Sequence, residues 1–388
     1  MANSLRRRSV CARRSLSKIK MNSNDVGQKS SKRTESLLSP EQGAMILKQF
    51  ADDLNRKDDE ISAEPTSKKS EKQAGSKTKK KASSVAPDAS SIGTAELLEF
   101  SRNGHLFLPD MLSIAGVSAT DLYDTLEDAF YDKRLEAFVQ KLRVFGVDEK
   151  TIKKINDPDE AYGLLQDLCE DEGFEIPFWQ LFNPHRDDRP YASLLNKICL
   201  NKGIGKLAAD LLGVDSVMLY QTCAFIKEPG HGETAWHSDL NTSPFDTNDM
   251  LTFWISVTPV KDLDDSPLEF ASGSHRDFAL PYWYSNEGMM NLEDRDYPVA
   301  SHAPLAPGDA TAHHGWVLHA APPNLSEDTR IAFTIAYVKT GAKRIPKKGL
   351  RRNPDDEDLE GYSAWIKDVA PGRPIKHAML PVVFSRKE

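Results

Sequence analysis

The spacing of apolar residues changes near Asp215, and this change constrains the fold more than any other feature of the sequence. Up to that point apolar residues recur mostly at helical intervals, as in residues 120–146. Beyond it lie short, partly alternating segments rich in β-branched and aromatic residues, separated by clusters of Pro, Gly, Asp and Asn; the clearest are residues 216–230, 249–260 and 329–339. Helices followed by short strands predict a β-sandwich or barrel with a helical layer against one sheet.

The folded region is expected to begin near Thr94. Residues 95–113 predict a short helix, a strand and a turn into another helix, and residues 192–213 predict a buried helix pair broken at Gly203 and Gly205. The predicted organisation is one folded domain over residues 93–388, with a helical layer at about 94–215, a strand-rich core at about 216–340 and an ordered extension at 341–388.

Charge separates the first part of the chain from the rest. The net charge is -8 over 388 residues, yet residues 1–87 carry 20 Lys and Arg against 10 Asp and Glu, and the remainder carries 30 against 48. Residues 65–91 have almost no large apolar side chain, so they cannot bury enough surface to offset the entropy lost on ordering. Residues 1–92 are therefore predicted to be a disordered basic tail on an acidic body.

The first twenty residues contain seven basic residues, several serines and no acidic residue, which is typical of an organelle transit peptide. A solvated basic tail and a nuclear-type basic cluster fit this composition equally well. The expected location is intracellular: mitochondrial or plastid if the segment is a transit peptide, and cytoplasmic otherwise. No apolar run reaches ~18 residues, so no transmembrane helix is predicted. The four cysteines lack paired spacing and are interpreted as reduced thiols.

His237 and Asp239 stand two residues apart, and this pair gains meaning only if a third ligand lies elsewhere in the chain. On a strand, residues i and i+2 point to the same side, so both side chains could reach one ion. The histidines of residues 308–330 are candidates for the third ligand. One of them, His319, is followed eleven residues later by Arg330, which opens the last clear strand and shares a face with small residues. A long cation above small side chains is typical of a cavity that holds a ligand.

Two histidines and one carboxylate on one side of a metal ion leave three coordination positions open, as in non-haem Fe(II) oxygenases. A closed structural zinc site would need four protein ligands, usually including paired cysteines, which this chain lacks. A guanidinium holds a carboxylate with two parallel hydrogen bonds. Arg330 therefore suits the distal carboxylate of a 2-oxo diacid whose oxo-acid end would chelate the iron.

Three segments, in this order, resemble the phytanoyl-CoA dioxygenase family of Fe(II)- and 2-oxoglutarate-dependent oxygenases: WHSDLNTSPFDTNDMLTFWISV, PLEFASGSHR and GDATAHHGWVLHAAPPNLSEDTRIAFTIAYV. The resemblance extends over roughly residues 96–338. It implies that His237, Asp239 and His319 are the iron ligands and that Arg330 anchors 2-oxoglutarate. It also implies a mainly β fold with packing helices (α+β), built on a double-stranded β-helix (jelly-roll or cupin-like) core.

The activity implied by the resemblance is hydroxylation of a small organic substrate, with release of succinate and CO2. The implied cofactors are Fe(2+), with 2-oxoglutarate and O2 as co-substrates and ascorbate as a candidate reductant. An acyl-CoA, a free acid and a specialised metabolite all remain open as the substrate. The alternative function is a catalytically silent jelly-roll protein that binds a ligand or a partner.

Three positions test the resemblance. The family commonly has Ser or Thr two residues after the distal histidine, where this chain has Ala321, so one hydrogen bond to the co-substrate is missing or comes from another group. This departure is the best support for the silent alternative. Ser266 replaces the usual Gly before PLEF, which is expected to alter a turn and not the chemistry. Asp239 retains the carboxylate that related halogenases replace with a small residue, so its presence favours hydroxylation.

Four further residues are predicted near the pocket. Gln221 is a candidate for binding 2-oxoglutarate, and Trp236, Trp254 and His231 are candidates for the substrate pocket. The competing interpretation makes the two tryptophans core residues and His231 a solvated loop residue. Both interpretations stay open at this point.

Three other histidines are given structural roles. His314 is expected to pack beside the site, His313 to be exposed on the opposite side of its strand, and His275 to shape a turn. The basic run KRIPKKGLRR, residues 343–352, is a solvated face by default, or binds the phosphates of a CoA thioester. A small-molecule substrate is expected and a nucleic acid is not, because the body is acidic and lacks interleaved basic and aromatic residues. The sequence leaves the oligomeric state open.

Overall fold

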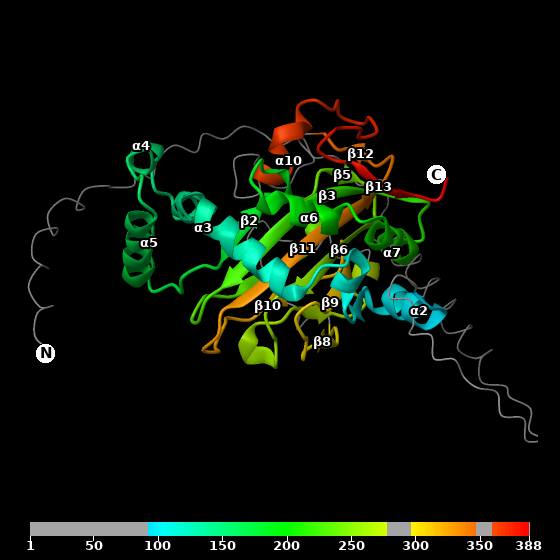
Figure 1. Ribbon diagram of the computed structural model, residues 1–388, viewed down its shortest axis with the longest axis horizontal. Helices are drawn as coiled ribbons and strands as arrows, with labels where there is room; N and C mark the ends of the chain where they lie inside the picture. Colours follow the sequence, from blue (N-terminus) through cyan, green and yellow to red (C-terminus); the bar gives the residue numbers. More distant parts are fainter. Residues whose placement is uncertain (1–91, 278–295, 347–358, 388) are drawn as a thin grey trace, which may run out of the picture. The chain divides into compact units, whose positions relative to one another are not determined.

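The computed structural model describes residues 92–277, 296–346 and 359–387 (Figure 1). The predicted basic tail with its candidate transit peptide lies outside these residues, and so does most of the basic run 343–352. The described helices are α2 (Thr94–Asn103), η1 (Met111–Ala115), α3 (Ala119–Val144), α4 (Glu149–Ile152), α5 (Pro158–Glu172), η2 (Pro184–Arg186), α6 (Tyr191–Cys199), α7 (Lys202–Leu212), α8 (Asp239–Thr242), η3 (Leu263–Asp265), η4 (Ser274–Arg276) and α10 (Leu359–Ile366). The described strands are β1 (His105–Leu108), β2 (Trp179–Phe182), β3 (Ser216–Lys227), β4 (Thr234–His237), β5 (Phe245–Asp246), β6 (Met250–Ser256), β7 (Glu269–Ala271), β8 (Val299–Ser301), β9 (Ala310–His314), β10 (His319–Ala321), β11 (Arg330–Lys339), β12 (Lys343–Arg344) and β13 (Val382–Ser385).

The strands form two main antiparallel sheets. The larger sheet has seven strands in the order β1-β9-β6-β11-β3-β13, with β2 pairing against the far half of β3. The smaller sheet has the order β4-β10-β7-β8, and a short β12-β5 pair stands apart from both. Consecutive strands repeatedly fall in different sheets, which is the crossover pattern of a double-stranded β-helix.

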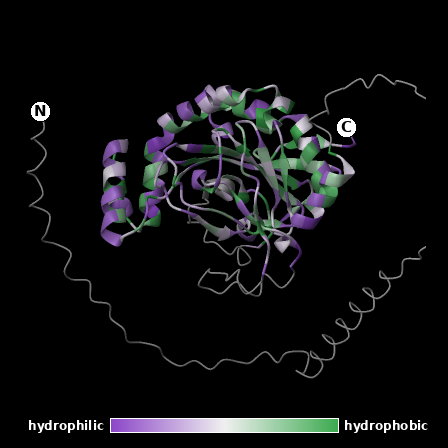
Figure 2. Cartoon of the chain, turned by 90° about the horizontal axis from the view of Figure 1, so that it is seen from below, coloured by the Kyte–Doolittle hydropathy of each residue, from purple (hydrophilic) through white to green (hydrophobic). Residues whose placement is uncertain are grey.

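The two faces of the large sheet carry different side chains because residues alternate along each strand. On β11, Phe333, Ile335 and Tyr337 belong to one continuous apolar core with residues of α3, α6 and α7. The opposite face of β11 carries Arg330 and Ala332, and Ala332 packs with residues of β6, β7 and β10. Figures 1 and 2 show the helices along one side of the large sheet, with hydrophobic and hydrophilic residues interspersed along them. The predicted helical layer against one sheet is therefore confirmed.

The C-terminal extension completes the interior. Strand β13 pairs with the start of β3 at the sheet edge. Trp365 of α10 is fully buried in an apolar cluster that also contains Tyr220, Leu240 and Met250 from the strand-rich core. The extension thus packs directly beside the turn that follows β4.

Two details of the helical region differ from expectation. The break between α6 and α7 lies at residues 200–201 and not at Gly203 and Gly205, because Asn201 caps α7 by accepting a hydrogen bond from the Gly203 amide. Gly205 lies inside α7, where a Cβ would come within 2.8 Å of a Val383 methyl group, so it allows close packing against β13. The strand β2 was not predicted, since four residues are too few to show a period.

The observed architecture is the mainly β fold with packing helices that the resemblance implied, built on a jelly-roll core. The four-stranded sheet covers the face of the large sheet that the helices leave open. Among the described helices, none is both long enough and apolar enough to cross a membrane.

Candidate metal centre

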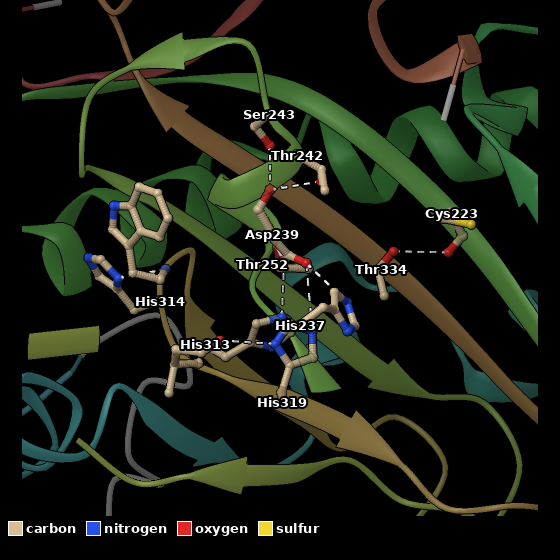
Figure 3. A network of polar contacts seen from close by, with 12 residues as sticks. Cys223, His237, Asp239, Thr242, Ser243, Thr252, His313, His314, His319 and Thr334 are labelled. Atoms are coloured by element: carbon tan, nitrogen blue, oxygen red, sulfur yellow. Dashed lines mark hydrogen bonds and ion pairs between the residues drawn. The ribbon is translucent and has the colours of Figure 1, made fainter. Parts of the chain in front are cut away.

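The side chains of His237, Asp239 and His319 converge between the two sheets (Figure 3). One nitrogen of each imidazole and one carboxylate oxygen all lie within 4.8 Å of one another. Strands β4 and β10 pair so that His237 and His319 are register partners, with ring centroids 4.2 Å apart. Pairing of two strands far apart in sequence therefore brings together the three residues that the sequence proposed.

His237 and Asp239 do not share one strand, which corrects the expectation drawn from side-chain alternation. His237 is the last residue of β4, and Asp239 is the first residue of α8. The turn is held by a hydrogen bond from the Leu240 amide to the Gly315 carbonyl. A Cβ at Gly315 would come within 2.7 Å of the Leu240 side chain, so only glycine allows this approach. The carboxylate thus reaches the histidines from a helical turn.

Both imidazoles are oriented by backbone carbonyls. The Nδ1 atom of His237 lies 2.9 Å from the Ala235 oxygen, and Nδ1 of His319 lies 3.1 Å from the Val317 oxygen. A carbonyl can only accept, so each Nδ1 carries the proton and each Nε2 keeps its lone pair. Metal-ligating histidines are commonly fixed in this way. The two Nε2 atoms lie 3.7 and 3.6 Å from Oδ1 of Asp239, so the three candidate ligand atoms face one point.

The other carboxylate oxygen of Asp239 is already occupied. The Thr252 hydroxyl donates to Oδ2 over 2.6 Å, and Nε2 of His313 lies 3.2 Å from the same atom (Figure 3). Thr252 and His313 are register partners on β6 and β9, so one row of the large sheet supplies both donors. Asp239 is therefore set up to give a metal ion one oxygen, Oδ1.

His313 and His314 exchange the roles that were expected. His313 was predicted to be exposed, yet its side chain is only 2% exposed and contacts Asp239. His314 packs away from Asp239, near Phe100, where its Nδ1 accepts from the Trp316 amide. The alternation along β9 has the opposite phase to the one assumed, because His313 and not His314 faces the small sheet.

The protonation states suit a metal ion. Burial lowers the pKa of His319 well below its usual value, and the nearby His237 and His313 lower it further, so the imidazole is neutral near pH 7. Burial alone would raise the pKa of Asp239, but interactions with His319 and His313 outweigh it and hold the pKa well below its usual value. Two imidazoles and one anionic carboxylate can hold Fe(II) on one side and leave other positions open.

Arg330 is the first residue of β11, on the same face as Ala332, and is 3% exposed. Its guanidinium carbon is 5.5 Å from the centre of the Trp254 ring, and its Nη2 lies 3.3 Å from the Ser266 hydroxyl. Its Nε and Nη1 have no hydrogen-bond partner among the described residues. Burial lowers the pKa of Arg330 to about 9, which still leaves it charged at neutral pH. A buried guanidinium with unused donors is suited to a carboxylate.

Ser266 was expected to alter a turn and not the chemistry, and the structure places its side chain against Arg330. It is fully buried, and its hydroxyl contacts Arg330 and donates to the Pro322 carbonyl over 2.5 Å. Ala321 has no hydroxyl, and the hydroxyl that contacts Arg330 belongs to Ser266. This hydroxyl comes from a different loop from the one that contains the position of Ala321.

Lys227 is a residue that the sequence did not single out. It is the register partner of Arg330 on β3 and is 0% exposed. Its Nζ lies 2.8 Å from the Pro322 oxygen and 3.4 Å from the Ala321 oxygen. Burial, reinforced by Arg330, lowers the pKa of Lys227 to about 6. Its place at the end of β3, opposite the arginine, was the signal that could have revealed it.

Of the remaining predicted residues, Gln221 and the two tryptophans lie at or near the strands of the site, and His231 does not. Gln221 lies half-buried on the metal-facing side of β3, in the row of Ala336. Trp254 is buried beside Arg330, and Trp236 packs partly buried at the small sheet. His231 is neither solvated nor placed at the metal, since it is 2% exposed and its ring meets Trp179 edge-on at 5.0 Å.

A cavity of about 410 Å³ opens at another place, between α3, β2 and η2. Lys133, Arg186 and Asp187 are among its lining residues, and none of the predicted site residues is. The metal centre and this cavity are therefore separate features.

Of the basic run, residues 343–346 are described, and they include β12, which pairs with β5.

Comparison with known proteins gives the family. The family profile described as phytanoyl-CoA dioxygenase (PhyH) matches residues 114–332, which is more than half of the chain. The chain belongs to the phytanoyl-CoA dioxygenase family. Iron and 2-oxoglutarate fit the three converging donors and the buried arginine of this member.

Solved structures agree with the fold. The chain is similar to the non-haem α-ketoglutarate-dependent carbocyclase SnoK from nogalamycin biosynthesis, with 19% identity, a TM-score of 0.50, and coverage of 76% of this chain and 97% of SnoK. It is also similar to the epimerase SnoN from the same biosynthesis (17% identity, TM-score 0.47, 74% and 97% covered) and to EctD from S. alaskensis (20%, 0.47, 69% and 84%). No curated protein matches the sequence.

Proposed function

We propose that the protein is an Fe(II)- and 2-oxoglutarate-dependent dioxygenase that hydroxylates a small organic substrate and releases succinate and CO2. The observation that carries this proposal is the convergence of His237, Asp239 and His319, whose candidate ligand atoms all lie within 4.8 Å of one another. An iron ion held there would supply oxygen activation coupled to decarboxylation of the 2-oxo acid.

The residues of the chain supply geometry and charge. Backbone carbonyls hold both imidazoles, and Thr252 and His313 hold Asp239, so the ligands need little rearrangement when metal binds. Arg330 would receive the distal carboxylate of 2-oxoglutarate. Asp239 occupies the coordination position that a halide would need, which favours hydroxylation over halogenation.

The silent alternative loses its main support. It rested on Ala321, and Ser266 now provides a hydroxyl at Arg330. The substrate stays open among acyl-CoA thioesters, free acids and specialised metabolites. Most of the basic run that would bind the phosphates of a CoA thioester, residues 347–352, lies outside the described residues.

The test is succinate formation by the full-length protein with Fe(II), 2-oxoglutarate, O2 and ascorbate, first without and then with a panel of substrates. The panel pairs each acyl-CoA with its free acid. We expect succinate from the wild-type protein and none above background from His237→Ala. Absence of succinate under every condition would contradict the proposal, and equal turnover by His237→Ala would contradict the ligand assignment.

A further inference from the structure

Two buried basic side chains lie side by side where β11 begins and β3 ends. Arg330 and Lys227 are cross-strand partners, 3% and 0% exposed. Among the described residues, no carboxylate lies within ion-pair distance of either one. Buried charges are normally paired, because an unpaired ion loses its hydration without compensation. Arg330 is charged at neutral pH and therefore lacks a compensating anion, whereas Lys227 stays mostly neutral until an anion arrives.

A short chain of hydrogen bonds joins the two cations. Nη2 of Arg330 donates to the Ser266 hydroxyl, which donates to the Pro322 carbonyl, and that carbonyl also accepts from Nζ of Lys227. Arg330 belongs to β11 and Lys227 to β3, while Ser266 lies in the loop after η3. They surround one location although they are up to 103 positions apart in sequence.

Ser266 adopts an unfavourable backbone conformation to reach this place. Its φ of 57° lies in the left-handed region, where a side chain other than glycine is strained. Strain of this kind is concentrated where a side chain has a task. A glycine would fit the turn better, so the hydroxyl is the gain from having serine.

We propose that Lys227 completes, together with Arg330, the binding site for the distal carboxylate of 2-oxoglutarate, and that Ser266 holds the guanidinium of Arg330 in place for it. This inference rests on the proposed function and names two residues of its co-substrate site. An ammonium has three donors, and two of those on Lys227 are directed at carbonyls, so one is available to an anion. The site discriminates a diacid from a monoacid by offering two cations where the monoacid has only a methyl group.

Binding should then be coupled to uptake of a proton by Lys227. The groups that act on Lys227 are Arg330, which disfavours its charge, and Glu233 and Glu175, which favour it. With a pKa of about 6, most Lys227 side chains are neutral at neutral pH in the free protein. An arriving carboxylate favours the charged form, so the amine takes up a proton as the complex forms.

The experiment is calorimetric titration of the full-length protein loaded with Mn(II) in place of Fe(II), so that the 2-oxo acid binds without being turned over. The ligands are 2-oxoglutarate and 2-oxobutyrate, which lacks the distal carboxylate. We expect Lys227→Met and Ser266→Ala each to weaken 2-oxoglutarate binding by about tenfold. Binding of 2-oxobutyrate should change by less than about twofold, because it makes none of these contacts.

Lys141→Met is the matched control. Lys141 is also buried, and its Nζ lies 5.0 Å from the centre of the same Phe178 ring that lies 5.1 Å from Nζ of Lys227. Its side chain donates to Gln180. We expect this variant to bind both ligands like the wild-type protein.

Proton uptake separates a binding role from a merely structural one. Titrations in two buffers of different ionisation enthalpy should show uptake approaching one proton per 2-oxoglutarate in the wild-type protein and much less in Lys227→Met. This measurement on wild-type protein stands even if a variant does not fold. If 2-oxoglutarate binds but neither substitution changes its affinity relative to 2-oxobutyrate, the inference is wrong and the proposed function stands. If wild-type protein does not bind 2-oxoglutarate at all, both are wrong.

Discussion

The interior between the two sheets has two polar regions that are built in opposite ways. Around the metal centre the protein satisfies the accessory atoms: carbonyls take both Nδ1 atoms, and Thr252 and His313 take one oxygen of Asp239. Around Arg330 two guanidinium nitrogens lack a described partner and Lys227 lacks a counter-charge. The first region is complete except for a cation, and the second is complete except for an anion.

This contrast assigns the two regions separate tasks. Rigid, satisfied ligands define the place of an ion, since each donor atom has few alternatives. Unsatisfied donors define the charge and shape of a molecule that must arrive from solution. Variants in one region should therefore leave binding in the other largely intact.

The largest effect is expected for Asp239→Ala. Losing the anionic ligand should weaken Mn(II) or Fe(II) binding by more than the ~100-fold typical of residues that only orient ligands. Turnover should fall to background, as measured by metal titration and succinate formation. Asp249→Asn is the matched control, because Asp249 pairs with Lys339 at the surface and should leave both quantities near wild type. Near-normal metal affinity in Asp239→Ala would remove the carboxylate from the ligand set.

The second prediction changes Arg330 and tests whether the metal centre is independent of the region around it. Arg330→Met should raise the dissociation constant for 2-oxoglutarate by at least about 100-fold, because two charge-assisted hydrogen bonds at about 1.5–3 kcal/mol each are lost. Metal affinity in the same variant should stay within about twofold of wild type. A parallel loss of metal binding would show that the two regions form one coupled unit.

Much of this contrast was visible in the sequence, for a local reason. Alternation along residues 330–337 correctly separated an apolar face from the face of Arg330, because strand periodicity is set by neighbouring residues. The motif around His237 and Asp239 and the position of His319 were likewise predicted together, although the ligand roles remain predictions.

The parts that the sequence did not reveal depend on pairing between distant segments. Lys227 matters because β3 pairs with β11 in a register that places it opposite Arg330. Ser266 matters because its loop returns to the same place. His313 was assigned to the wrong side because both faces of β9 are buried, so hydrophobicity gives no phase. For His231 the Pro-Gly turn beside it left a solvated loop and a pocket position both open, and its side chain is in fact buried against Trp179.

The third prediction compares two adjacent histidines. His313→Phe should lower metal affinity by about 10- to 100-fold, because Asp239 loses one of the two donors that hold its second oxygen. His314→Phe should have little effect, since His314 packs near Phe100 and does not touch Asp239. Metal titration of both variants checks this, and equal losses would indicate general destabilisation instead of ligand positioning.

The smallest effect concerns the free energy of unfolding and its dependence on pH, and it involves the region of Arg330 and Lys227, called here the anchor region. The pKa of Lys227 is about 6 in the folded protein against an ordinary value of 10.5, so between these values the unfolded chain binds more protons at this residue. Burying Lys227 therefore costs stability, most fully below about pH 6, and the cost shrinks as the pH rises toward 10.5. Without 2-oxoglutarate, Lys227→Met should raise the free energy of unfolding near neutral pH by on the order of 1 kcal/mol. Urea unfolding at several pH values should show this gain falling as the pH rises, and saturating 2-oxoglutarate should stabilise the wild-type protein more than the variant. A gain that does not vary with pH would mean that Lys227 is not buried as a neutral amine, and the anchor region would then resemble the satisfied metal centre.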